Sequence, residues 1–130
     1  NLKRGPGGVV DIEFIVQMLQ LVHGGREPRL RTTETLAALD LLHEAGHLSD
    51  ERHDFLARAY RTLRAIEGRL RLLDASARHE FPASADDQRR LAHLLGYASP
   101  DRLVTDVREI TGRTRAEFER IFAETEERLR

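Results

Sequence analysis

The chain has 130 residues, of which 40% are apolar and 33% are charged, and its formal net charge is −1. This length suits one domain that buries a real hydrophobic core. The near balance of 21 basic and 22 acidic residues gives no general attraction to polyanions. Five Phe, two Tyr and no Trp leave little aromatic surface for stacking on bases. We therefore expect no nucleic-acid partner.

The chain contains no cysteine, which excludes disulfides, thiolate catalysis and cysteine-ligated metals from its own residues. No apolar run reaches the roughly 18–20 residues of a membrane span, and the first residues lack the apolar block of a secretion signal. We expect a cytoplasmic protein with no membrane partner. The chain also begins without Met, and we interpret it as a piece of a longer polypeptide.

Helix start and stop signals recur along the chain, whereas strand signals are nearly absent. After a glycine-rich bend over residues 1–8, an apolar helix is predicted from about Val9 to Val22. A second helix is predicted to begin with Thr32 or Thr33 as its N-cap and to end near Glu44, before Gly46.

A third helix is predicted after a Ser49 cap, and Phe81-Pro82 interrupts the segment that follows it. Its apolar residues recur every three or four positions, which is typical of a helix with one buried face. These residues are Leu56, Tyr60, Leu63, Ile66, Leu70 and Leu73.

A fourth helix is predicted from the Ser84 cap to Gly96, and a fifth begins at Ser99-Pro100, with proline at its favoured first position. The fifth helix carries an apolar seam with a period close to 3.5. The seam consists of Leu103, Val107, Ile110, Thr114, Phe118 and Ile121. The whole pattern predicts an all-α fold, a bundle of about five helices formed by residues 9–130 as a single domain.

The glycine-rich bend is the part of the sequence that looks shaped by chemistry rather than by packing. Glycines around Pro6 let the backbone approach another surface closely, and a helix that begins there points free N–H groups toward an anion such as phosphate. The stretch Gly5-Pro6-Gly7-Gly8 is neither a P-loop nor a dinucleotide fingerprint.

Helical geometry separates the two acidic residues that follow, because about 160° divides Asp11 from Glu13. Asp11 falls on the apolar side of the helix and Glu13 on the polar side. We expect Asp11 to cap N–H groups at the helix start, to pair with Lys3 or Arg4 across the bend, or to face a cleft. The two carboxylates are not expected to work as an acid–base pair or to share a metal, so we assign them structural or interface roles.

A second motif, His43-Glu44-Ala45-Gly46-His47, matches the H-E-x-x-H zinc pattern. That chemistry needs both histidines on one continuous helical face and a third ligand beyond them. Gly46 falls where the second helix should end, and no other histidine has the spacing of a third ligand. We interpret the motif as a chance match and expect no metal site, with a small zinc hydrolase as the alternative.

At the start of the chain Leu2-Lys3-Arg4-Gly5-Pro6-Gly7-Gly8 leads through Asp11-Ile12-Glu13-Phe14 to Gln17. This stretch resembles the glutamine synthetase adenylyltransferase family, whose bifunctional members attach AMP to glutamine synthetase and remove it. Pro28-Arg29-Leu30-Arg31 and Ala59-Tyr60-Arg61-Thr62-Leu63-Arg64 are also similar to the family. The resemblance extends from about Leu2 to Leu73, and beyond that it lies only in helical character. Asp-Ile-Glu-Phe is more typical of the C-terminal, AMP-adding half of these enzymes.

The resemblance implies a helical accessory domain, with residues 1–8 as a hinge from an upstream nucleotidyltransferase domain. It implies Mg²⁺ and ATP as cofactors of the parent enzyme, with Lys3, Arg4, Gly7 and Gly8 near the nucleotide phosphates. The implied partners are the upstream domain, glutamine synthetase and a PII-type regulatory protein, and the implied role is regulation of nitrogen metabolism.

The catalytic motif of the family, of the type G-S-x-x-D-x-D with carboxylates that hold two Mg²⁺, does not occur in this sequence. We therefore expect no catalytic residue in this chain, no cofactor bound by it alone, and no activity of the isolated chain. Two alternatives are a stand-alone helical module that binds a protein through the fifth helix, and the helical domain of a related uridylyltransferase.

Overall fold

The described part of the chain contains five α-helices and one short 3-10 helix, joined by loops. The computed structural model describes residues 1–73 and 79–129. In chain order the elements are α1 (Val9–His23), η1 (Pro28–Leu30), α2 (Thr35–Glu44), α3 (Asp50–Leu73), α4 (Ala85–Leu95) and α5 (Pro100–Arg128). Over these residues the prediction of an all-α bundle is confirmed.

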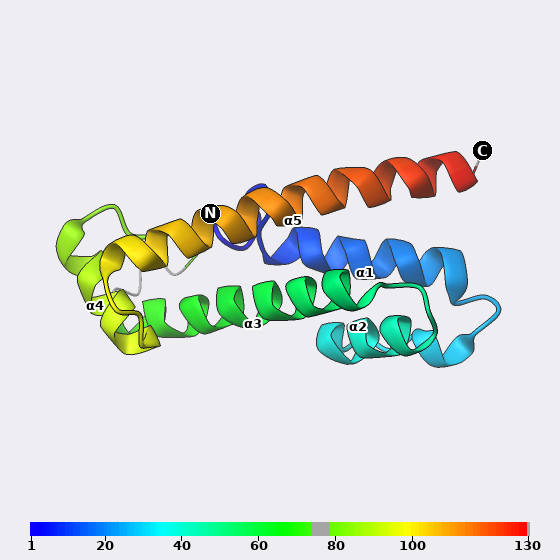
Figure 1. The fold of residues 1–130 in the computed structure, drawn as a ribbon, viewed down its shortest axis with the longest axis horizontal. Coiled ribbons are helices and arrows are strands. Elements are labelled where there is room, and N and C mark those ends of the chain that lie inside the picture. The colour runs from blue at the N-terminus through cyan, green and yellow to red at the C-terminus, as the bar shows by residue number, and fades with distance from the viewer. Residues whose placement is uncertain (74–78, 130) are drawn as a thin grey trace.

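The bundle is elongated because two long helices, α3 and α5, run along it in opposite directions (Figure 1). Helix α1 lies beside the second half of α5 and runs parallel to it (Figure 1). Helix α2 packs against α3 at one end of the bundle, and α4 closes the other end. Within the described residues, no helix combines the length and the apolar character that crossing a membrane requires.

Three of the predicted helix starts are confirmed by serine caps. The hydroxyl oxygen of Ser49 accepts a hydrogen bond from the Arg52 N–H at 3.2 Å. Ser84 and Ser99 cap α4 and α5 in the same way. Because the first N–H groups of a helix have no partner within it, these caps position each helix start locally.

The predicted start of α2 was wrong, since neither Thr32 nor Thr33 is its N-cap. The helix begins at Thr35, and its N-cap position is Glu34, which makes no side-chain cap. The side-chain amide of Gln20 in α1 donates to the carbonyl oxygens of Leu30 and Thr32, at 2.6 and 2.8 Å. These bonds from α1 hold the preceding loop outside the helix, which a local cap signal does not reveal.

The core follows the predicted apolar periodicity. Of the predicted α3 stripe, Tyr60 and Leu73 are half-buried and the other four residues are buried. In the α5 seam Phe118 is half-buried and the remaining five residues are buried. The seam of α5 and the stripe of α3 therefore form the two long sides of one core, and α1 packs against both helices.

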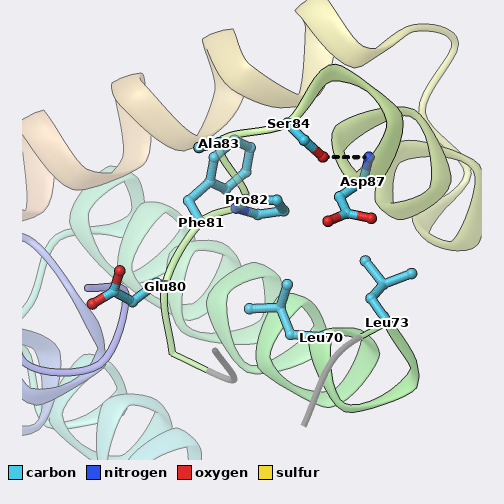
Figure 2. A pocket seen from close by; sticks show the side chains of 8 residues that line it. All are labelled: Leu70, Leu73, Glu80, Phe81, Pro82, Ala83, Ser84 and Asp87. Carbon is cyan, nitrogen blue, oxygen red and sulfur yellow. Dashed lines mark hydrogen bonds between the residues drawn. The ribbon is translucent and has the colours of Figure 1, made fainter. Parts of the chain in front are cut away.

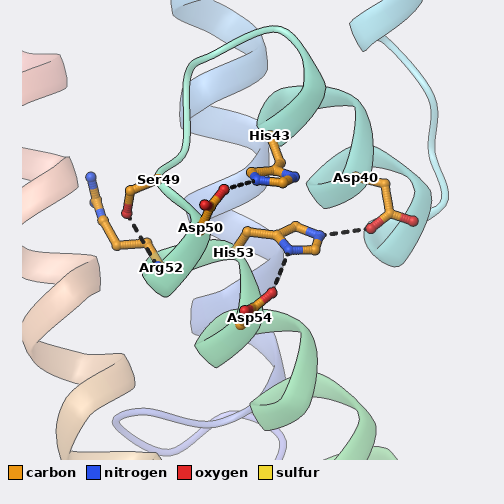
Figure 3. Close-up of polar contacts among 7 residues, drawn as sticks. All are labelled: Asp40, His43, Ser49, Asp50, Arg52, His53 and Asp54. Atoms are coloured by element: carbon orange, nitrogen blue, oxygen red, sulfur yellow. Dashed lines mark hydrogen bonds and ion pairs between the residues drawn. The ribbon is translucent and has the colours of Figure 1, made fainter.

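Histidine–aspartate pairs join α2 to α3 (Figure 3). His43 of α2 bonds to Asp50 at 2.6 Å, and its ring stacks on that of His53 with centroids 4.4 Å apart. His53 of α3 bonds to Asp40 at 2.7 Å and to Asp54 at 3.1 Å. Burial alone would lower the pKa of His53, but the hydrogen bonds to the two aspartates outweigh it and raise the pKa.

This raised pKa predicts a pH-dependent contribution of His53 to stability. A histidine whose pKa is higher in the folded state stabilises the fold below the unfolded value of about 6.5 and loses that contribution as pH rises through the folded value. We expect the difference in unfolding free energy between the wild type and His53→Gln to shrink as pH rises above about 6.5. Urea unfolding followed by circular dichroism measures this difference at each pH.

His93→Gln is the matched control, because His93 is exposed on α4 and the structure gives it no ion pair in the described part of the chain. Its unfolding free energy should track that of the wild type across the same pH range. A difference for His53→Gln that is constant or grows with pH would contradict the pairing of His53 with the two aspartates.

Candidate functional site

The N-terminal segment, residues 1–8, is hydrogen-bonded to the start of α1. The carbonyl oxygens of Leu2 and Lys3 each accept a bond from the first turn of the helix, from Val9 N–H and Val10 N–H, both at 2.9 Å. The N–H of Gly8 donates to the carbonyl oxygen of Gly5 at 3.0 Å. The prediction that the helix start offers free N–H groups to an anion is therefore wrong for these amides.

Gly7 brings this segment into direct contact with α5. Its φ is +77°, and a β-carbon there would lie 1.9 Å from the carbonyl oxygen of Thr111. Only glycine fits at this position. Any side chain would collide with the α5 backbone, and residues other than glycine also disfavour the left-handed conformation that Gly7 adopts. The close approach expected of the bend is confirmed, and the surface that it approaches belongs to this chain.

Gly8 is enclosed by the N-terminal segment itself. A β-carbon at Gly8 would lie 2.5 Å from the carbonyl oxygen of Leu2, and both Gly7 and Gly8 are buried. Neither glycine therefore has an amide exposed for a phosphate in this conformation. Their predicted place near a nucleotide stays a prediction.

Asp11 is the buried charge at the centre of this contact. One of its carboxylate oxygens, Oδ2, accepts the Gly7 N–H at 2.6 Å and an N–H of the Arg115 guanidinium at 3.2 Å. The capping interpretation is wrong for the helix itself, because Gly7 precedes the N-cap residue Gly8 and α1 has no side-chain cap. Asp11 does pair with a basic residue, but that residue is Arg115 on α5 rather than Lys3 or Arg4. The hydrogen bond to Asp11 is the main cause that raises the pKa of Arg115.

Besides pairing with Asp11, Arg115 contacts an aromatic ring on its own helix. Its guanidinium lies over the Phe118 ring, 4.7 Å from the centroid, and its Nε bonds to Glu119 at 3.1 Å. Sequence reasoning missed both Arg115 and Thr111 because they lie 104 positions after Asp11 and Gly7. The charged run of α5 gave no signal that distinguished Arg115 from its neighbours.

Glu13 lies apart from Asp11, as the helical geometry predicted. It is half-buried and lines a groove between α1 and the loop before α2, together with Gln17 and Arg31. Lys3 is half-buried and Arg4 is exposed. The side chains of Lys3 and Arg4 form no ion pair with a residue that the structure describes.

The H-E-x-x-H motif does not assemble. Helix α2 ends at Glu44, so His47 lies beyond its last turn, as predicted. His43 bonds to Asp50, whereas His47 bonds to Glu27 at 2.6 Å and stacks on His23 with centroids 3.6 Å apart. The described residues contain no cluster of three or more metal-ligating side chains.

An apolar hollow lies between the end of α3 and the start of α4 (Figure 2). Leu70, Leu73, Phe81 and Pro82 line it. The Ser84 hydroxyl is engaged with the Asp87 N–H at 3.1 Å, and Glu80 and Asp87 lie on different sides of the hollow (Figure 2). No nucleophile and base are paired among the residues that line it, so we assign no chemistry to this hollow.

The contact between Gly7 and Thr111 predicts a large cost for Gly7→Ala. The substitution imposes about 1–2 kcal/mol of left-handed backbone strain. It also pushes the N-terminal segment off α5, so we expect a total loss of unfolding free energy of at least about 3 kcal/mol. Urea unfolding measures the loss.

Gly96→Ala provides the matched control, since Gly96 has φ +78° but no atom within 4 Å of the added β-carbon. It should cost only the backbone strain, about 1–2 kcal/mol. Equal losses for the two variants would show that Gly7 does not contact α5.

Comparisons with known proteins show sequence similarity over nearly the whole chain. A family model described as GlnD PII-uridylyltransferase matches residues 1–125. The chain is 42% identical over 123 residues to the bifunctional glutamine synthetase adenylyltransferase/adenylyl-removing enzyme of Xanthomonas axonopodis pv. citri, which is 95% of this chain and 13% of that enzyme. The likeness therefore continues beyond Leu73, where sequence reasoning found only helical character.

Relatives from other bacteria give the same result. The enzyme of the same name from Bradyrhizobium sp. is 40% identical over 107 residues, 82% of this chain and 11% of its own length. That from Ralstonia nicotianae is 34% identical over 127 residues, 98% of this chain and 13% of its own length. The chain thus spans only about an eighth of the curated relatives that it matches. Since the family model covers nearly all of it, this helical chain belongs to the GlnD PII-uridylyltransferase family and is homologous to a segment of bifunctional glutamine synthetase adenylyltransferase/adenylyl-removing enzymes.

Proposed function

We propose that the chain is the helical accessory domain of a cytoplasmic enzyme that adenylylates and deadenylylates glutamine synthetase. The likeness of 95% of this chain to 13% of an enzyme with that name carries the proposal. In this function the domain supports nucleotidyl transfer, and the chemistry takes place in another part of the polypeptide. Regulation of nitrogen assimilation follows from the target, glutamine synthetase.

The contacts that the aspartates make support placing the chemistry in another part of the polypeptide. Asp11 is buried, and its Oδ2 is bonded to the Gly7 N–H and to Arg115, so this carboxylate holds the N-terminal segment and α5 together. Asp86 pairs with Arg89 at 3.1 Å, and the neighbouring Asp87 lies at the capped start of α4. The described residues therefore do not fit a Mg²⁺ site, and we derive no step of the reaction through the metal in this chain.

The side chains of Lys3 and Arg4 are the groups through which this domain would contact ATP. Their backbone N–H groups both donate to the side-chain oxygen of Asn1, at 2.9 and 2.8 Å, which holds the turn that carries them. A guanidinium and an ammonium suit phosphate oxygens, to which they donate charge-assisted hydrogen bonds. In this function the two cations lie against the nucleotide held by a preceding nucleotidyltransferase domain.

A second candidate is the helical domain of a PII-uridylyltransferase, which the description of the matching family model favours. A PII-type protein would then be the substrate, whereas in the first candidate it is a regulatory partner. The relatives that match the chain are named as adenylyltransferases, so we place the first candidate ahead.

The proposal is tested by measuring which substrate the full-length gene product modifies. We expect it to transfer AMP from ATP to glutamine synthetase in the presence of Mg²⁺, and the 130-residue chain alone to transfer none. Replacing Lys3 and Arg4 together by Ala should lower kcat/KM for AMP transfer by about tenfold or more, because a hydrogen bond to a charged group contributes roughly 1.5–3 kcal/mol. Incorporation of labelled AMP measures the rate.

Arg29→Ala is the control for general loss of positive charge, because Arg29 is exposed in η1, which follows the end of α1 opposite the N-terminal segment. Its kcat/KM should stay close to that of the wild type. UMP transfer to a PII-type protein without AMP transfer would establish the second candidate instead. AMP transfer by the 130 residues alone would refute the accessory role.

A further inference from the structure

A polar cavity lies at the end of the bundle where α1 and α5 both finish (Figure 1). Its walls are the last turns of these two helices and the loops that follow α1 and α2. The side chains that line it are Val22, His23, Arg26, Glu27, His47 and Arg128. Its volume is about 340 Å³, at the lower end of the range of about 300–1,000 Å³ that is typical of ligand pockets. Because all the lining side chains except Val22 carry charged or titratable groups, a ligand there would be held by charge.

Two stacked imidazoles form one side of this cavity. The ring centroids of His23 and His47 are 3.6 Å apart, and the ring planes are inclined by 10°. His47 bonds to Glu27 at 2.6 Å, so the acidic residue that lines the cavity is already engaged. Burial is the main cause that lowers the pKa of His23, and the charges of His47 and Arg128 lower it further, whereas Glu27 raises it. The surroundings of His23 are therefore electrostatically positive.

The two arginines of the cavity lack a carboxylate partner. Arg26 in the loop after α1 and Arg128 in the last turn of α5 are exposed, and neither forms an ion pair with a residue that the structure describes. Glu124 and Glu127 line a neighbouring hollow together with Arg128, but neither is paired with it. One cavity thus brings together two guanidinium groups and the imidazole of His23 without an anion to balance them.

We propose that this cavity binds a phosphate group, either as the free anion or as part of a phosphomonoester. Guanidinium groups donate paired, charge-assisted hydrogen bonds to phosphate oxygens, and the imidazole of His23 adds a further N–H donor. The charges of Arg26 and Arg128 balance the two negative charges of a phosphate, whereas a carboxylate carries only one. A bound phosphate would also favour the protonated form of His23.

This site is separate from the cations that we assign to the nucleotide. Lys3 and Arg4 precede α1, and the cavity lies at the last turn of that helix. The 15 residues of α1 place the two sites about 20 Å apart at a rise of roughly 1.5 Å per residue. The inference therefore goes beyond the proposed function and does not depend on it.

Modification of histidines by diethyl pyrocarbonate tests the proposal in the full-length gene product. The reagent attacks the neutral imidazole, so a bound phosphate slows the reaction of His23 by covering the ring and by favouring its protonated form. With a dissociation constant on the order of 1 mM, 10 mM inorganic phosphate should slow modification about tenfold at constant ionic strength. Peptide mass mapping measures the rate at each histidine. His93, which is exposed on α4 at the other end of the bundle, should react at an unchanged rate.

A pair of double variants separates the cavity from general effects of charge. Arg26→Gln with Arg128→Gln should abolish the protection of His23, because it removes both guanidinium groups. Arg102→Gln with Arg108→Gln is the matched control, since it removes the same charge from exposed positions in the first turns of α5. The control variant should keep the protection of the wild type.

A parallel titration with AMP distinguishes the two sources of the phosphate group. Protection by inorganic phosphate assigns the cavity to the free anion, and protection by AMP alone assigns it to a phosphomonoester. Each of these outcomes supports the proposal. Absence of protection by both, equal protection by potassium chloride, or protection that persists in Arg26→Gln with Arg128→Gln would overturn it. The modification needs no AMP transfer, so its result is independent of the proposed function.

Discussion

The parallel contact between α1 and α5 is the constraint on which the rest of this structure depends. Two parallel helices that are distant in sequence cannot be joined by a short turn, so their register must be fixed by contacts. Gly7 on the Thr111 carbonyl sets the distance of approach, and Asp11 with Arg115 sets the register one turn later. Phe14 on Phe118, with ring centroids 6.4 Å apart, continues the same register.

Features encoded locally could be predicted from the sequence. The serine caps before α3, α4 and α5 and the apolar periodicity of α3 and α5 each depend on residues within one or two turns, and each is found as expected. The start of α2 was mispredicted because Gln20, on another helix, holds the loop before it. The burial of Asp11 could be inferred from its angle on the helix, but Arg115 could not, since 104 residues separate them.

The candidate site likewise combines features that are encoded locally with contacts between residues that are distant in the sequence. The glycines of the N-terminal segment fit the opening motif of the family, yet in this conformation their amides bind the chain itself. The motif therefore has a structural explanation that needs no nucleotide: it places residues 1–8 on α5. The cations Lys3 and Arg4 precede this contact in the chain, and we propose them as the groups that contact the nucleotide.

Hydrogen exchange at the Gly7 amide tests the central contact most directly. This N–H belongs to an irregular segment, where an unbonded amide would exchange within a small factor of an unstructured peptide. Because it donates to the buried carboxylate of Asp11 at 2.6 Å, we expect slow exchange, with protection on the order of a thousandfold or more. Exchange of the Gly7 amide at the unstructured rate, while the α5 core amides stay protected, would contradict the contact.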